Sequence, residues 1–164
     1  MRSEKGQSAK GTRGARGPGE GRRTGYVTFE LAGGLYGIAV LDVQEVLTEQ
    51  RRTRVPTAPP EVAGLVNLRG QVVTAIDLRL RLGLPPRPQG ARSTDVVVRI
   101  GDEAVSLLVD GIGDVVEVED DDLEPPPDGL SGPMADLVLG AHQLPDRLLL
   151  PLDAVRAASL DVSV

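Results

Sequence analysis

The chain has 164 residues, of which 40% are hydrophobic and 26% charged, the composition of one globular domain long enough to bury a core. It has no cysteine and a single histidine, which excludes disulfides, thiolate metal sites and any zinc site built from two histidines of one chain. The absence of cysteine fits a cytoplasmic location, which we predict. No run of 18 apolar residues occurs, so no membrane insertion is predicted.

The net charge of −6 is the sum of two unlike parts. Residues 1–25 hold seven of the 18 Lys and Arg and two of the 24 acids, a net charge of +5, together with seven glycines. This leaves eleven Arg and 22 acids in the remainder, a net charge of −11. A basic, glycine-rich segment cannot bury enough apolar surface to order itself, so residues 1–25 are predicted to be a disordered leader. Its role stays open between contact with an anionic partner and a dispensable extension.

Period-two alternation of apolar residues begins at Tyr26 and predicts strands. A β-hairpin is expected, with strands over Tyr26–Leu31 and Leu35–Val40 and a glycine turn between them. Residues 41–47 fit either a helix or a strand, and the prolines of 51–60 predict a linker.

Further along the chain, short strands recur at close intervals. They are predicted over 71–78, 95–100, 104–110, 115–118, 137–144 and 147–152. Short helical turns are predicted over 61–66, 79–83 and 153–160, the last N-capped by Asp153, with an acidic irregular loop over 119–133. Eight or nine short strands without alternating long helices predict an antiparallel β sandwich or barrel.

None of the motifs that carry catalysis or cofactor binding is complete. Gly111 and Gly113 begin like a dinucleotide fingerprint, but Val116 stands at the third glycine position, so a turn is predicted there. The acids of 117–124 lack the spacing of an EF-hand loop, and His142 is predicted to be an ordinary strand residue. We therefore predict no cofactor, no metal site and no enzymatic activity.

Arg69 is the most unusual polar residue of the ordered region, because it lies in an apolar stretch between Gly64 and Gly70. Its guanidinium must extend to solvent, pair with an acid such as Asp77 or Glu45, or face a partner. Asn67, the only asparagine in the chain, is predicted to be a turn residue that bonds its own backbone.

The stretch VAGLVNLRGQVVTAIDLRLRLGL at 62–84 resembles the signature of the CheW-like domain. The resemblance extends over residues 26–160 and includes the segments FELAGGLYGIAVLDVQEVL, LLVDGIGDVVEV and LVLGAHQLPDRLLLPLD. It implies a mainly antiparallel all-β fold with short helices, made of two small five-stranded SH3-like β-barrel subdomains packed together, with 161–164 as a C-terminal tail. It also implies a non-enzymatic adaptor that joins the cytoplasmic tip of a chemoreceptor to the regulatory domain of the histidine kinase CheA.

The resemblance also implies a contact surface for the receptor and the kinase. Arg69 of the NLRG motif is expected on the receptor-facing side, with Asn67 and Gly70 beside it in the motif. The other residues that match contact positions are Val43, Glu45, Val46, Val96 and Val97. Asp77 matches the acid of a DLR motif and is expected to be structural. Thr74 and Ala75 replace the family's usual Pro-Val pair, which restores a backbone donor and shortens a side chain.

Two alternatives remain beside the chemotaxis adaptor. Within the family, the chain could serve another receptor and kinase pathway, such as surface motility. From another class, a small β-barrel could bind single-stranded nucleic acid through its basic leader, but the chain has only three aromatic residues for base stacking, Tyr26, Phe29 and Tyr36, and its body has a net charge of −11. We therefore expect protein partners, no nucleic acid, and a cytoplasmic location at membrane receptor arrays.

Overall fold

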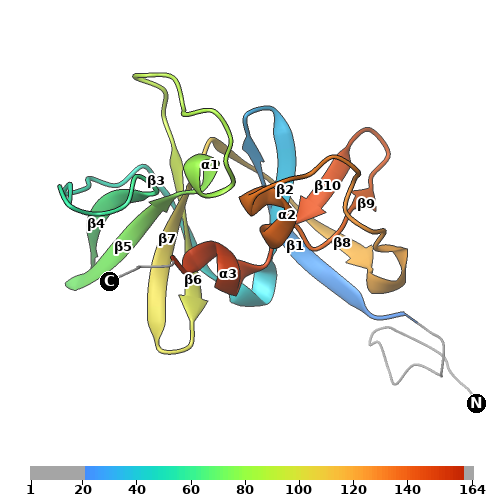
Figure 1. Cartoon of the computed structure of the whole chain (residues 1–164). Helices are drawn as coiled ribbons and strands as arrows, with labels where there is room; N and C mark the ends of the chain where they lie inside the picture. The colour runs from blue at the N-terminus through green and yellow to red at the C-terminus, as the bar shows by residue number, and fades with distance from the viewer. Residues whose placement is uncertain (1–20, 161–164) are drawn as a thin grey trace, which may run out of the picture.

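The computed structural model describes residues 21–160, so most of the predicted leader and the predicted tail 161–164 lie outside the described residues. Two five-stranded sheets lie side by side with short helices between them (Figure 1). Sheet A has the order β8-β1-β2-β10-β9, with β1 Arg23–Leu31, β2 Gly34–Ala39, β8 Gly111–Glu119, β9 His142–Gln143 and β10 Leu148–Pro151. Sheet B has the order β3-β6-β7-β5-β4, with β3 Val43–Thr48, β4 Val62–Leu68, β5 Gln71–Asp77, β6 Thr94–Ile100 and β7 Glu103–Val109.

The helices are all short. They are α1 Leu78–Arg81, α2 Pro133–Leu137 and α3 Ala154–Ala158, with single 3-10 turns η2 Val40–Asp42 and η3 Asp120–Asp122. Asp77 caps α1 by accepting from the Leu80 N–H, and Asp153 caps α3 by accepting from the Arg156 N–H. Both carboxylates satisfy a backbone donor that the first helical turn leaves free, so the expected structural role of Asp77 and the cap at Asp153 are confirmed.

The predicted fold class is confirmed, since two five-stranded units make up a mainly antiparallel structure. Two pairings are parallel, β2 with β10 and β5 with β7, so both sheets are mixed. The segment 41–47, which fitted either a helix or a strand, forms β3 after a single 3-10 turn.

One large core is shared between the sheets. Phe29 and Ile38 of sheet A, Val96 and Leu107 of sheet B, and Leu137 of α2 belong to a single cluster of buried side chains. A smaller cluster lies on the other face of sheet B. Its buried members are Val66, Leu68, Val73, Ala75, Val97 and Leu108. Sheet B therefore has apolar side chains on both of its faces, as expected of a curled sheet closing towards a barrel.

Three predictions of local structure are wrong. The helical turn over 61–66 is strand β4, whose Gly64 allows the backbone of Thr53 to approach. The turn around Gly111 is instead the beginning of β8, which follows β7 with only Asp110 between them. The strand over 137–144 is reduced to β9, because Pro133 begins α2 and Leu137 is buried as that helix's last residue.

Sheet B is closed by its two edges. β3 and β4 are the outer strands, and the chain that follows β3 turns back so that Thr53 and Leu65 exchange both backbone hydrogen bonds, at 2.8 Å each. Gly64 lies beside this bridge with φ of 149°, and a Cβ at that position would lie 2.6 Å from the Thr53 carbonyl oxygen. The edges meet only because residue 64 has no side chain.

Candidate functional site

The NLRG motif forms the tight turn between β4 and β5. Arg69 has a positive φ of 52°, which is uncommon for a residue other than glycine, and Gly70 follows at 85°. The Asn67 side-chain oxygen accepts from the Gly70 N–H at 2.9 Å, which confirms that Asn67 is a turn residue that bonds its own backbone. The turn fixes the direction in which the Arg69 side chain leaves the sheet.

Arg69 pairs with Glu45 where the two edges of sheet B, β3 and β4, approach each other. Its Nη1 lies 2.5 Å from Oε2 of Glu45 and its Nη2 lies 2.7 Å from Oε1, a bidentate ion pair. Of the two acids that the sequence offered as partners, Glu45 is therefore the one that binds Arg69. Asp77 is instead close to Arg87, with 3.7 Å between its Oδ2 and Nη1 of Arg87. The pair joins β3 to the β4–β5 turn, elements from opposite edges of the sheet.

The two charges of this pair differ in exposure. The Arg69 side chain is 73% exposed and the Glu45 side chain 17%. Hydrogen bonds from Arg69 hold the pKa of Glu45 below its usual range, and the same contact raises the pKa of Arg69. Both oxygens of the carboxylate are thus bonded to Arg69, while the guanidinium remains largely exposed to solvent and able to contact a partner.

The β3 residues predicted to touch partners divide by exposure. Val46 is 40% exposed and lies next to Glu45, whereas Val43 is half-buried and packs against the shared core. Val96 and Val97 are wholly buried on β6, opposite Val46 and Glu45 in register. Direct contact of Val96 or Val97 with a partner is incompatible with this burial. Their side chains instead belong to the two cores of the molecule, Val96 to the shared cluster and Val97 to the smaller one.

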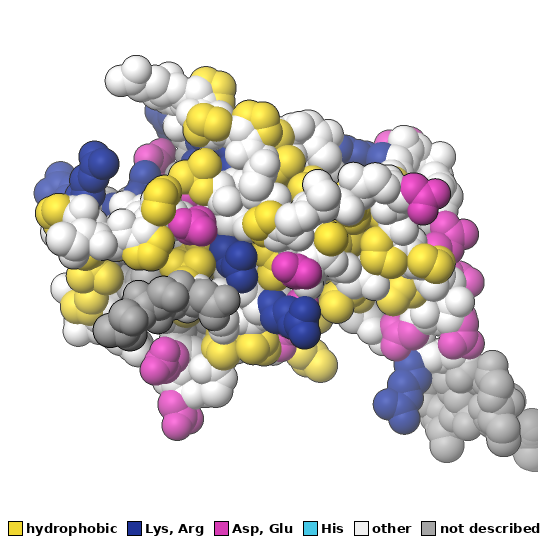
Figure 2. All heavy atoms as spheres, viewed as in Figure 1, with side chains coloured by type: hydrophobic (Ala, Val, Ile, Leu, Met, Phe, Trp, Pro, Cys, Tyr) yellow, Lys and Arg dark blue, Asp and Glu magenta, His cyan; other side chains and the backbone are white. Residues whose placement is uncertain are grey.

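Two further surface features are seen only in the structure. Val72, directly after the NLRG turn, is 63% exposed, and the doublet Val72-Val73 could have indicated it, because neighbouring strand residues face opposite sides. Basic side chains also gather at the end of sheet B, over the connection between β3 and β4 (Figure 2). Arg51, Arg52 and Arg54 line a cleft there.

A network of charges joins the two sheets at the end of β7. Asp110 accepts from Arg79 Nε at 2.9 Å and from Arg87 Nε at 3.1 Å, both arginines of the sheet B side. Its other oxygen accepts from the Ala32 N–H, in the β1–β2 turn of sheet A, at 2.8 Å. Burial alone would raise the pKa of Asp110, but these hydrogen bonds hold it below its usual range.

Several kinds of site are not found among residues 21–160. These residues hold no group of three or more His, Cys, Asp or Glu side chains placed to bind a metal ion, and none of their helices is long and apolar enough to cross a membrane. His142 is buried beside the Tyr26 ring, and burial lowers its pKa. The chain's three aromatic rings, those of Tyr26, Phe29 and Tyr36, are all buried, so no ring is available for base stacking.

Comparison with known proteins identifies the family. Residues 25–161 match the model of the CheW-like domain, and the chain belongs to that family. It is 32% identical to the chemotaxis protein CheW of Helicobacter pylori over 124 residues, which cover 76% of this chain and 74% of that protein. It is 28% identical to the chemotaxis protein CheW of Klebsiella aerogenes, over 82% of this chain and 81% of the relative.

A solved structure supports the same assignment. The crystal structure of the scaffolding protein TtCheW from Thermoanaerobacter tengcongensis superposes with a TM-score of 0.76 at 27% identity, covering 87% of this chain and 97% of the other. Membership of this family confirms the prediction of a non-enzymatic chemotaxis adaptor.

Proposed function

We propose that this chain couples the cytoplasmic tip of chemoreceptors to the regulatory domain of the histidine kinase CheA, and that it does so in the cytoplasm at membrane receptor arrays. Its contact surface comprises Glu45, Val46, Asn67, Arg69 and Gly70, to which we add Val72. The observation that carries the proposal is the Arg69–Glu45 pair, in which an ordered guanidinium is 73% exposed. Val46, next to Glu45 along β3, and Val72, three residues after Arg69, are exposed as well. A few well-placed arginine and apolar side chains supply most of the binding energy in such interfaces.

The proposal predicts that Arg69→Glu weakens binding without unfolding the chain. The substitution places two carboxylates side by side and removes the open guanidinium, so retention on receptor-containing membranes should fall at least about ten-fold, the loss typical of an interface anchor. Co-sedimentation with receptors and with the kinase, measured separately, tells which partner this surface binds. The far-UV circular dichroism spectrum should stay that of the unsubstituted chain.

Arg99→Glu is the matched control, because Arg99 is an exposed residue of β6 and the change in charge is the same. It should bind as the unsubstituted chain does. Equal retention of Arg69→Glu and Arg99→Glu on both partners would contradict the proposed surface.

A further inference from the structure

One carboxylate lies wholly inside sheet B and takes no part in the Arg69–Glu45 pair. Asp95, the second residue of β6, is 0% exposed and stands in register between Leu47 of β3 and Leu108 of β7. Val97, two residues further along and on the same face, belongs to the small core of sheet B. Asp95 therefore occupies a position where the strand pattern would place an aliphatic side chain.

The two oxygens of Asp95 bind different parts of the sheet. Oδ2 accepts from the Ser106 hydroxyl of β7 at 2.7 Å, a fully buried hydrogen bond. Oδ1 accepts from the backbone N–H of Gln50 at 3.2 Å. Gln50 follows the end of β3 by two residues, so the carboxylate ties the centre of the sheet to the chain just beyond its edge strand.

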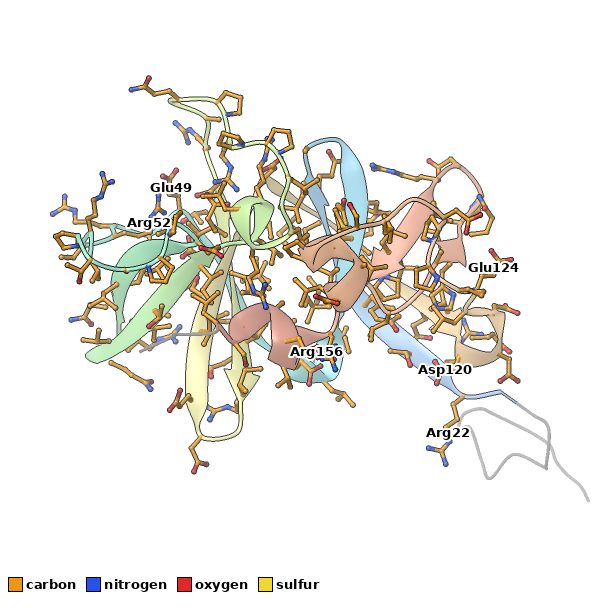
Figure 3. All side chains as sticks on the ribbon, in the orientation of Figure 1. Arg22, Glu49, Arg52, Asp120, Glu124 and Arg156 are labelled. Carbon is orange, nitrogen blue, oxygen red and sulfur yellow. The ribbon has the colours of Figure 1, made fainter. Side chains whose placement is uncertain are left out.

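The charged groups that face Asp95 come from the same segment after β3. Arg52 attracts its negative charge and Glu49 repels it, and these two side chains lie 3.9 Å apart (Figure 3). Burial raises the pKa of Asp95, while the hydrogen bonds from Ser106 and Gln50 and the charge of Arg52 oppose the rise.

Burying a carboxylate costs free energy, and filling the space inside the sheet does not require one. Apolar side chains of similar volume often replace buried charges with no loss of stability. An aliphatic residue at 95 would extend the run Val96–Val98, but the Gln50 N–H and the Ser106 hydroxyl would lose their acceptor. Asp95 contributes what an aliphatic side chain cannot, a fixed position for the end of β3.

That position matters because β3 is an edge strand. Within sheet B it pairs only with β6, and its register shifts between Val43 and Glu45. Glu45 lies opposite Val97, two residues from Asp95 on β6. Any movement of the end of β3 would displace Glu45 and, through the bidentate pair, Arg69.

We propose that Asp95, together with Ser106, is a positioning residue for the partner-binding surface, holding the end of β3 so that Glu45, Val46 and Arg69 keep their arrangement. The inference rests on the proposed function, since it concerns the same surface. Asp95 touches no partner, and its effect on binding is transmitted through Gln50 and β3.

The test compares Asp95→Leu with Asp102→Leu, which makes the same change in the exposed turn between β6 and β7. Asp95→Leu removes the acceptor of the Gln50 N–H and of the Ser106 hydroxyl, and because an apolar side chain can often replace a buried charge, its melting temperature should stay close to that of the unsubstituted chain. Its retention on receptor-containing membranes should fall roughly five-fold, the equivalent of one hydrogen bond. Asp102→Leu should bind as the unsubstituted chain does. A purely structural role would instead change stability and binding together.

Ser106→Ala keeps the carboxylate and deletes the bond that holds its second oxygen, so it decides the matter if Asp95→Leu fails to fold. It should also weaken retention. Normal retention of Asp95→Leu, or of Ser106→Ala where the first variant does not fold, overturns the positioning role. If Arg69→Glu still weakens binding in that assay, only the positioning role fails. If Arg69→Glu also binds normally, the proposed function itself fails.

Discussion

At the scale of single residues, the proposed contact surface depends on backbone geometry as much as on side-chain chemistry. Arg69 holds a left-handed conformation that costs about 1 kcal/mol in a residue other than glycine. The Asn67 side chain accepts a hydrogen bond within the same turn, and the Arg69 guanidinium donates to Glu45, so both contacts stabilise the strained conformation. The guanidinium is therefore presented in one direction before any partner arrives, which reduces the entropy lost on binding.

Gly64→Ala tests the closure of sheet B at its narrowest point. The added methyl group would lie 2.6 Å from the Thr53 carbonyl oxygen, at a φ that alanine rarely adopts, so the free energy of unfolding should fall by about 2 kcal/mol. Urea denaturation measures the change. Gly111→Ala is the control, because a Cβ there meets no atom within 4 Å. Equal stability of the two variants would contradict the close approach of Thr53.

At the scale of elements, alternation of residues predicted most strands but not those set by tertiary contacts. Residues 26–31, 71–77 and 95–100 have the predicted strand state because each places apolar residues at the alternating positions of at least one buried face. β4 was missed because the sequence does not show that Thr53 packs on Gly64. The strand predicted over 137–144 is mostly absent, since a proline earlier in the chain begins a helix there.

The candidate site was predictable in part for the same reason. Arg69 was conspicuous because a charged residue interrupts an apolar stretch, and Glu45 was one of two acids considered as its partner. Asp95 gave only a weak signal, a single acid before three valines. Its role depends on Ser106 and Gln50, which are 11 and 45 residues away along the chain.

Asp110→Asn tests the junction between α1, β7 and the β1–β2 turn. Loss of the negative charge would leave Arg79 without its counter-ion and Arg87 with Asp77 alone, and both arginines are mostly buried, so the free energy of unfolding should fall by about 3 kcal/mol. The pKa of Asp110 is lowered on folding, so its contribution is complete above the ordinary carboxyl pKa and is lost as the pH falls through the lower folded value.

Denaturation of the unsubstituted chain across this acidic range should therefore show a fall in the free energy of unfolding that is absent from Asp110→Asn. The exposed Asp128→Asn serves as the control and should keep the acid-dependent loss. A variant at 110 with unchanged stability and an unchanged pH profile would show that the network does not join the sheets.

At the scale of the whole molecule, the shared core makes the two sheets one folding unit. Phe29 and Leu107 come from different sheets and belong to the same buried cluster, which α2 and α3 also join. An adaptor with a single core can hold surfaces on its two halves at a fixed distance and angle. Relative motion of the halves would require opening this core.

Leu107→Ala should therefore destabilise both sheets, although the substitution lies in β7 alone. Truncation of this fully buried side chain should lower the free energy of unfolding by about 3 kcal/mol. Amide hydrogen exchange should accelerate to the same extent in β1 and β2 as in β6 and β7, because global opening exposes all of them. Faster exchange confined to sheet B would show that the sheets open separately.

The burial of the chain's few aromatic rings has a practical consequence for spectroscopy. The chain has no tryptophan, and its two tyrosines, Tyr26 and Tyr36, both lie in the β1–β2 hairpin. Intrinsic fluorescence therefore reports on sheet A alone, whereas far-ultraviolet circular dichroism averages over both sheets. Without any label, coincidence of the two signals during denaturation would demonstrate a single cooperative transition.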